Sequence, residues 1–137
     1  MVHSADIYKN FVSVIKPITG FKITQAFIDD FIETPSKKFQ NQIVITPPQL
    51  PATNYSFDDN SYNGDSTITI EIFASKLKDA TTAYDLVCDK ILSNKSAFIV
   101  QIRGLGDTSS SSVNAGGTNI HIVPIIVSFG FDFDITV

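Results

Sequence analysis

The sequence predicts an α+β fold: one domain in which a mainly antiparallel or mixed β-sheet packs against two amphipathic helices and carries a long hairpin loop. Three consecutive segments favour this class. Residues 67–74 alternate apolar and polar side chains, residues 80–92 repeat apolar side chains at helical spacing, and residues 97–103 return to alternation. A strand, an amphipathic helix and a second strand therefore follow one another at the centre of the chain.

Length and composition are those of one compact domain. The chain has 137 residues, of which 43% are hydrophobic and 18% charged, enough to bury a core without disulfides. We expect a single domain over residues 1–137, with flexible loops at about residues 49–66 and 104–119. The formal net charge of −4 argues against a nucleic-acid-binding surface, which needs clustered Lys and Arg.

Neither a membrane span nor a secretory segment is evident. No segment reaches the roughly 18 apolar residues that a membrane helix needs, and the first residues lack a basic stretch followed by an apolar run. Cys88 is the only cysteine, so no internal disulfide can form. We expect a cytosolic place of assembly and a small, buried, unreactive Cys88.

The N-terminal third predicts a helix and then two short strands. Ser4 is the expected N-cap of the first helix, which Pro17 and Gly20 close. Residues 21–32 are ambiguous, because the alternation from Phe21 favours a strand while the spacing of the later apolar residues favours a helical turn. Residues 42–46 are a short apolar strand, stopped by two prolines.

The central elements have clear faces. The dipeptide Asn63-Gly64 predicts a tight turn just before the strand at residues 67–74. In the helix that follows, the apolar side is expected to hold Ala80, Ala83, Tyr84, Val87, Ile91 and Leu92. In the strand at residues 97–103, Phe98, Val100 and Ile102 share one face.

The C-terminal part predicts a loop and then the longest strand. Residues 104–119 are rich in Ser and Gly and indicate a flexible loop between two strands. From Val123 to Val137 the odd positions are apolar, and Pro124 predicts an edge strand or a bulge.

The sequence contains no recognisable catalytic, metal or cofactor motif, and we expect no cofactor. It has only two histidines, His3 and His121, and neither a phosphate-binding loop nor a nucleophile elbow. Around Gly64, Asp59, Ser61, Asn63 and Asp65 have the spacing of calcium ligands. The twelfth position of such a loop is Ile70, so the bidentate carboxylate is missing and a solvated acidic loop is the better interpretation.

Three pairs of carboxylates remain. Asp29-Asp30 and Asp58-Asp59 are adjacent in sequence, whereas Asp132 and Asp134 share one face of the terminal strand. Acid–base work needs a pocket that raises one of the two pKa values, and nothing in the sequence supplies one. A solvated pair, or a negative stripe along the last strand, is the preferred interpretation.

The order of elements resembles that of the tail terminator (tail-completion, or neck) proteins of long-tailed bacteriophages. The resemblance is carried by residues 67–76, a strand that leads through a short turn into the amphipathic helix at residues 80–92. It implies a structural protein without turnover, assembled in the host cytoplasm and located in the virion tail-neck region. Such a protein forms a homo-oligomeric, hexameric ring that caps the tail tube and meets the head connector.

The resemblance also implies partners and surfaces. The partners are further copies of the chain, the tail tube protein and the head–tail connector protein, with DNA passing through the ring without specific binding. The candidate subunit or partner interface comprises Asp58, Asp59, Asn63, Gly64, Ser109, Ser110, Ser111, Ser112, Gly116, Gly117, Phe129, Phe131 and Phe133. Asp132 and Asp134 are the candidate acidic residues facing the lumen.

Two other function classes remain open. One is another small phage ring component, such as a head-closure, tail-tube or baseplate-proximal protein. The other is a small non-viral ligand-binding α+β domain that uses the loops around Asp58 and Ser110 for recognition. An enzyme is the least favoured class, because it would have to build a pocket around carboxylates alone.

Overall fold

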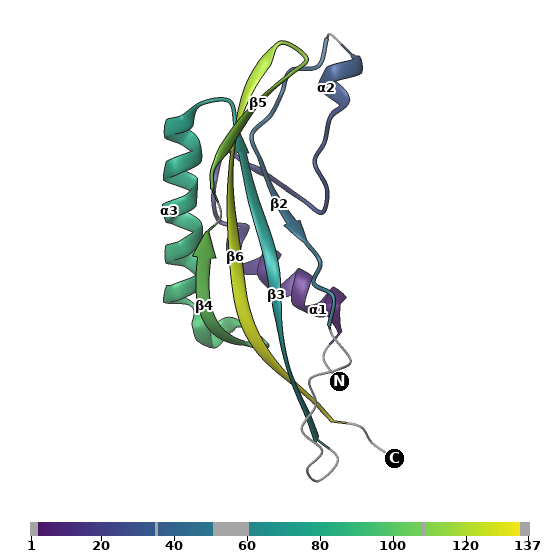
Figure 1. The fold of residues 1–137 in the computed structure, drawn as a ribbon, viewed down its shortest axis with the longest axis vertical. Helices are drawn as coiled ribbons and strands as arrows, with labels where there is room; N and C mark the ends of the chain where they lie inside the picture. The colour runs from purple at the N-terminus through teal and green to yellow at the C-terminus, as the bar shows by residue number, and fades with distance from the viewer. Residues whose placement is uncertain (1–2, 35, 51–60, 108, 135–137) are drawn as a thin grey trace.

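The computed structural model describes residues 3–34, 36–50, 61–107 and 109–134. Within these ranges the chain is an α+β domain with a mixed six-stranded sheet and two main helices, which confirms the predicted fold class (Figure 1). The elements run in the order α1 (Ser4–Ile15), β1 (Lys22–Thr24), α2 (Asp30–Glu33), β2 (Gln42–Thr46), β3 (Ser61–Ala74), α3 (Leu77–Ser93), the 3-10 turn η1 (Lys95–Ala97), β4 (Gln101–Asp107), β5 (Ser111–Ala115) and β6 (Thr118–Asp134).

The sheet is organised around one long pair of strands. β3 pairs antiparallel with β6 along its whole length, from Ser61 opposite Asp134 to Ala74 opposite His121. β2 and then β1 extend the sheet beyond β3, and β1 pairs parallel with β2. On its other side, β6 pairs first with β5 and then with β4. The result is an elongated molecule whose long axis follows β3 and β6 (Figure 1).

The main core lies between one face of the sheet and the helices α1 and α3. Phe11 from α1, Val87 from α3, Ile70 from β3 and Phe129 from β6 are fully buried in it. These side chains come from alternate strand positions and from one stripe of each helix, so the periodicity of the sequence is what brings them together. Burial of each contributes roughly 1.5–3 kcal/mol before chain entropy is subtracted.

A second, smaller core covers one end of the opposite face. Phe31, Val44, Phe73 and Ile120 are buried there, and the rings of Phe27 and Phe73 lie 4.6 Å apart. Nearby, the buried amide of Gln42 accepts a hydrogen bond from Ile28 N (2.8 Å) and donates one to Ile28 O (3.0 Å). This pair of bonds attaches the segment before α2 to β2, and the rest of this face carries exposed side chains such as Thr67 and Ser128.

The structure corrects three details of the helices. Ser4 is the first helical residue and not the N-cap, because the carbonyl of His3 accepts hydrogen bonds from Asp6 N and Ile7 N. Leu92 does not belong to the buried side of α3, since it is about half exposed while Ile91 is fully buried. Cys88, expected to be buried, is half-buried against the main core.

The two predicted loops are the largest corrections. The predicted loop at residues 104–119 instead contains the end of β4, all of β5 and the start of β6. In the predicted loop at residues 49–66, β3 already begins at Ser61, so Asn63 and Gly64 lie in a strand and not in a tight turn. Residues 51–60, including Asp58 and Asp59, lie outside the described residues.

Pro124 marks a change of partner in the sheet. β6 is paired on both sides over most of its length, but at Pro124 its outer side has no partner strand among the described residues, which agrees with the predicted edge or bulge at this position. β5 pairs with it as far as Ile122 and β4 from Ile125, which leaves Val123 and Pro124 between the two partners. A residue without an N–H is tolerated where the ladder is interrupted.

Candidate assembly surfaces

The predicted interface residues fall into two groups at opposite ends of β6. Gly116, Gly117 and the serines lie in and before the β5–β6 hairpin, whereas Asn63 and Gly64 pair with the far end of β6. β6 has 17 residues, so the two groups are separated by a distance on the order of 50 Å. Figure 1 shows the hairpin at one end of the molecule and the end of the β3–β6 ladder at the other.

At the end of the β3–β6 ladder, two of the predicted interface residues, Phe129 and Phe131, are buried and cannot contact a partner. Phe129 is 0% exposed and Phe131 is 3% exposed, because both face the core beneath the helices. The ring of Phe131 covers Gly64, where a Cβ would lie 2.4 Å from Phe131 Cζ. These residues serve packing, and the alternation of the sequence could not distinguish a core face from a surface face.

Four predicted surface residues remain at this end of the β3–β6 ladder: Asn63, Asp132, Phe133 and Asp134. The structure describes their backbone but not their side chains. Asn63 is opposite Asp132, Ser61 is opposite Asp134 and Tyr62 is opposite Phe133. The proposed acidic stripe of Asp132 and Asp134 therefore runs beside the first residues of β3. Whether these carboxylates face a lumen stays a prediction.

At the hairpin end, the serines belong to a strand with an open edge. Ser109 and Ser110 precede β5 and are exposed, while Ser111 and Ser112 are exposed within it. In the described part of the chain, β5 pairs only with β6, and its central residue, Val113, is 46% exposed. β5 thus offers one edge of its backbone and the exposed side chains of residues 111–114 to a partner.

The turn of this hairpin explains why β5 forms. Gly116 (φ +58) and Gly117 (φ +80) are both left-handed, as a two-residue turn that matches the twist of a hairpin requires. A Cβ on Gly116 would lie 3.3 Å from Ile32 Cα, so the turn packs closely against α2. The two glycines were the signal in the sequence that could have predicted the hairpin.

The uncovered face of the sheet carries a pair of opposite charges. Arg103 is the extra residue of an irregularity in β4, between the pairs formed by Ile102 and Gly104. Its guanidinium lies over Gly130 of β6 and forms an ion pair with Asp65 of β3 at 3.2 Å. Both side chains are more than half exposed, so the pair orients Arg103 more than it stabilises the fold.

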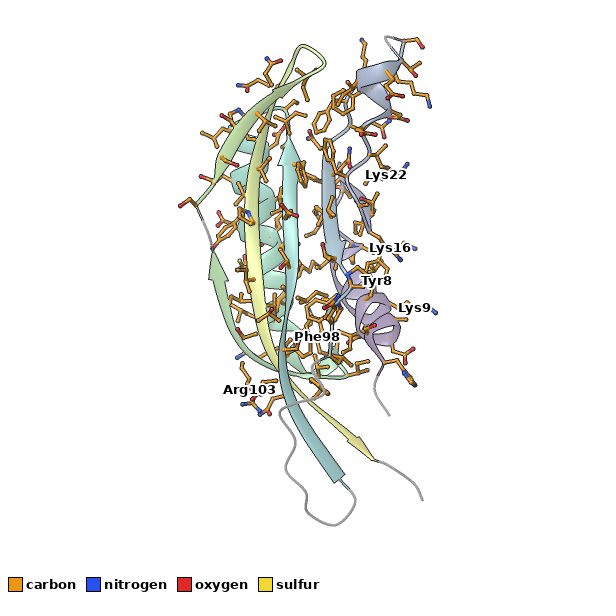
Figure 2. The ribbon with its side chains drawn as sticks, turned by 45° about the vertical axis from the view of Figure 1, so that its right-hand side comes forward. Tyr8, Lys9, Lys16, Lys22, Phe98 and Arg103 are labelled. Carbon is orange, nitrogen blue, oxygen red and sulfur yellow. The ribbon has the colours of Figure 1, made fainter. Side chains whose placement is uncertain are left out.

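Charged residues also separate between the two sides of the helical layer. Lys9, Lys16 and Lys22 are exposed and point away from the sheet along the side formed by α1 and β1 (Figure 2). On α3, the side turned away from the core holds Asp85 and Asp89, with the exposed Lys78 two turns before Asp85. The sequence alone could not place these two sets of charged residues on different sides of the molecule.

Two depressions in the described part of the surface hold polar side chains. One, of about 320 Å³, is lined by Lys22, Asp30, Phe31, Lys37 and neighbouring residues, and Lys37 pairs with Asp30 at 3.1 Å. Another, of about 200 Å³, is lined by Ser110–Ser112, His121 and apolar residues. Ser112 is directly opposite His121, but this lining includes no carboxylate that could orient the imidazole.

The described residues hold neither a metal-binding cluster nor a helix that could span a membrane. Among them, no group of three or more His, Cys, Asp or Glu side chains is placed to hold a metal ion. Likewise, no helix in the described ranges is long and apolar enough to cross a membrane.

Comparisons with known proteins gave a match at the level of structure. No protein-family model matches the chain, and no curated protein matches it. The chain is similar to a chain in a solved structure described as the virion of a native gene transfer agent (GTA) particle. The two share 11% sequence identity and a TM-score of 0.48, over 93% of each chain.

Proposed function

We propose that this chain is a structural protein of a phage-like virion, a tail terminator or neck protein that forms a ring on the end of the tail tube. The observation that carries the proposal is the placing of two surfaces at opposite ends of one elongated subunit. At one end is the open edge of β5 with its exposed serines, and at the other is the end of the β3–β6 ladder. A subunit that joins a tube to a connector needs a separate surface for each.

The central elements support the same proposal. β3 leads through Ser75 and Lys76 directly into α3, which is the arrangement on which the resemblance to tail terminators rests. In the proposal, the ring is hexameric and β5 receives an extended segment of the tube or connector protein by strand addition. The protein holds other proteins together and carries out no reaction.

Electron microscopy of particles made without this protein tests the proposal. Overlong or uncapped tail tubes are expected, because a terminator stops tube growth and prepares the tail for the head. Complete absence of tails would contradict the terminator role and favour a component needed earlier, such as a tail-tube or baseplate-proximal protein. Native mass spectrometry over a range of concentrations tests the ring itself, for which a hexamer is expected.

One observation favours a second candidate function, a ligand-binding α+β domain. Lys22, Lys37 and Lys38 line the same depression of about 320 Å³ together with Asp30, which pairs with Lys37, and the remaining excess of positive charge suits an anionic ligand. Thermal-shift measurements with a panel of small anions test it, since a ligand that binds only the folded state raises the melting temperature. No shift at millimolar concentrations would exclude this candidate.

A further inference from the structure

We propose that copies of this chain join head to tail, with the outer side of α3 of one copy against the lysine side of the next copy. The outer side of α3 is defined by Asp85, Leu86, Asp89 and Leu92, and the lysine side by Lys9, Lys16 and Lys22. This inference rests on the proposed ring and names the two surfaces that would close it.

The lysine side is basic within an acidic protein. The chain has a net charge of −4, yet Lys9 on α1, Lys16 just after α1 and Lys22 on β1 lie on the same side, all exposed (Figure 2). Within the described part of the chain, the ion pairs are Lys37–Asp30 and Arg103–Asp65, so these three ammonium groups have no carboxylate partner there. Asp6 is the one acidic residue of α1.

The outer side of α3 has the complementary character. Asp85, Asp89 and Leu92 follow one another at spacings of four and three residues, and Leu86 flanks them, so the four side chains form one stripe. Leu86 is 43% exposed and Leu92 is 49% exposed. Leu86 lies between the two aspartates and Leu92 follows them by less than one turn, so the surface has an apolar part that gains from burial and charges that select a basic partner.

The arrangement of the fold makes the contact head to tail. α3 packs on β3 and β6, whereas α1 packs on β2, and the sheet order places β1 and β2 at the edge away from β4. Figure 1 accordingly shows α3 along one side of the sheet and α1 with β2 towards the other. Because the two surfaces differ and lie on different sides, each contact leaves one of each kind free, and repetition gives a ring or a filament.

Charge reversal on each surface provides the test. Self-association of the full-length protein is measured by sedimentation at low and high salt, for wild type and for the variants Lys9→Glu/Lys22→Glu and Asp85→Lys/Asp89→Lys. Each variant alone is expected to associate about tenfold more weakly than wild type, because like charges then face each other. Wild-type association is expected to weaken at high salt, since these charges are exposed.

An equimolar mixture of the two variants is the decisive sample. The first variant keeps a native α3 side and the second keeps a native lysine side, so the mixture contains one unaltered contact and one with both charges exchanged. Association is expected to return to within about threefold of wild type. Circular dichroism confirms that each variant is folded before mixing.

Matched controls exclude a general effect of net charge. Lys76→Glu/Lys95→Glu changes the charge as much as the lysine variant does, at exposed residues that flank the two ends of α3. Asp29→Lys/Glu33→Lys does the same for the aspartate variant, near α2. Both controls are expected to associate as wild type does.

Two outcomes overturn the inference. If folded variants associate as well as wild type, or their mixture does not recover, the copies meet through other surfaces, and the proposed ring stands. If wild type remains a monomer at every concentration, the copies do not join through these surfaces. The terminator function is judged separately by tail length, so the two proposals can fail independently.

Discussion

Gly64 and Gly130 each lie directly beneath a side chain of this sheet. The cost of adding a methyl group at either position depends on whether that side chain can move. A Cβ on Gly64 would lie within 3.0 Å of three atoms of the Phe131 ring, and that ring is held in the core. Gly64→Ala is therefore expected to lower the free energy of unfolding by about 1–3 kcal/mol, as overpacking does. Urea denaturation of the full chain measures it.

Gly130 and Gly104 serve as matched controls for Gly64. A Cβ on Gly130 would also lie within 3.0 Å of three atoms, but they belong to the exposed guanidinium of Arg103, which can move. A Cβ on Gly104 would meet nothing within 4 Å. Alanine at either position is expected to cost less than at Gly64, and an equal cost at all three would contradict the packing of Phe131 over Gly64.

Gln42 shows what one buried amide contributes. It is 2% exposed and satisfies both the N–H and the C=O of Ile28. Gln42→Leu would leave two polar backbone groups without these partners, and a loss of about 1–3 kcal/mol in unfolding free energy is expected. Gln40→Leu, at an exposed position two residues away, is the control, and equal losses would show that the bonds to Ile28 contribute nothing.

At the scale of elements, α3 separates buried from exposed apolar residues at adjacent positions. Ile91 is 0% exposed and Leu92 is 49% exposed. Ile91→Ala is expected to destabilise the fold by about 2–5 kcal/mol, because it removes core contacts and leaves a cavity. Leu92→Ala is expected to change stability by less than about 0.5 kcal/mol in the isolated chain. Thermal denaturation of both variants checks the contrast, and equal effects would mean that the helix is rotated.

The elements that were predictable are those whose apolar side chains form a clear pattern, and they include β2, an apolar run that is buried on both faces. Residues 67–74 and 80–92 were predicted with the correct type because their apolar side chains repeat at the period of the element. β5 was not predicted, because nearly all of its side chains are exposed and its Ser and Asn residues, followed by two glycines, are typical of a loop. What holds β5 in place is the Gly116-Gly117 turn and its pairing with β6, which leave little trace in local hydrophobicity.

For the whole molecule, the limit of the sequence lies in contacts between distant segments. The alternation of Phe129 and Phe131 correctly indicated a strand, but their burial depends on the two helices that cover that face. Likewise, the strand order places Lys9 and Lys22 on one side of the molecule and Asp85 on a different side. A single sequence gives the faces of each element, and the sheet topology decides which faces meet.

The open edge of β5 supports a last prediction, which concerns assembly and not folding. In a hairpin with a two-residue turn, the pair next to the turn, Ala115 and Thr118, is hydrogen-bonded, and bonded pairs then alternate along the ladder. The N–H groups of Asn114 and Ser112 therefore point away from β6. Proline at both positions removes these outward donors and spares the bonds to β6, so stability is expected to change by about 1 kcal/mol or less.

If a tube or connector segment adds to this edge, Ser112→Pro/Asn114→Pro is expected to abolish co-sedimentation with purified tail tubes or connectors. Val113→Pro, whose N–H faces β6, is expected to destabilise the hairpin itself. Undiminished co-sedimentation of the folded double variant would show that partners bind elsewhere on the molecule.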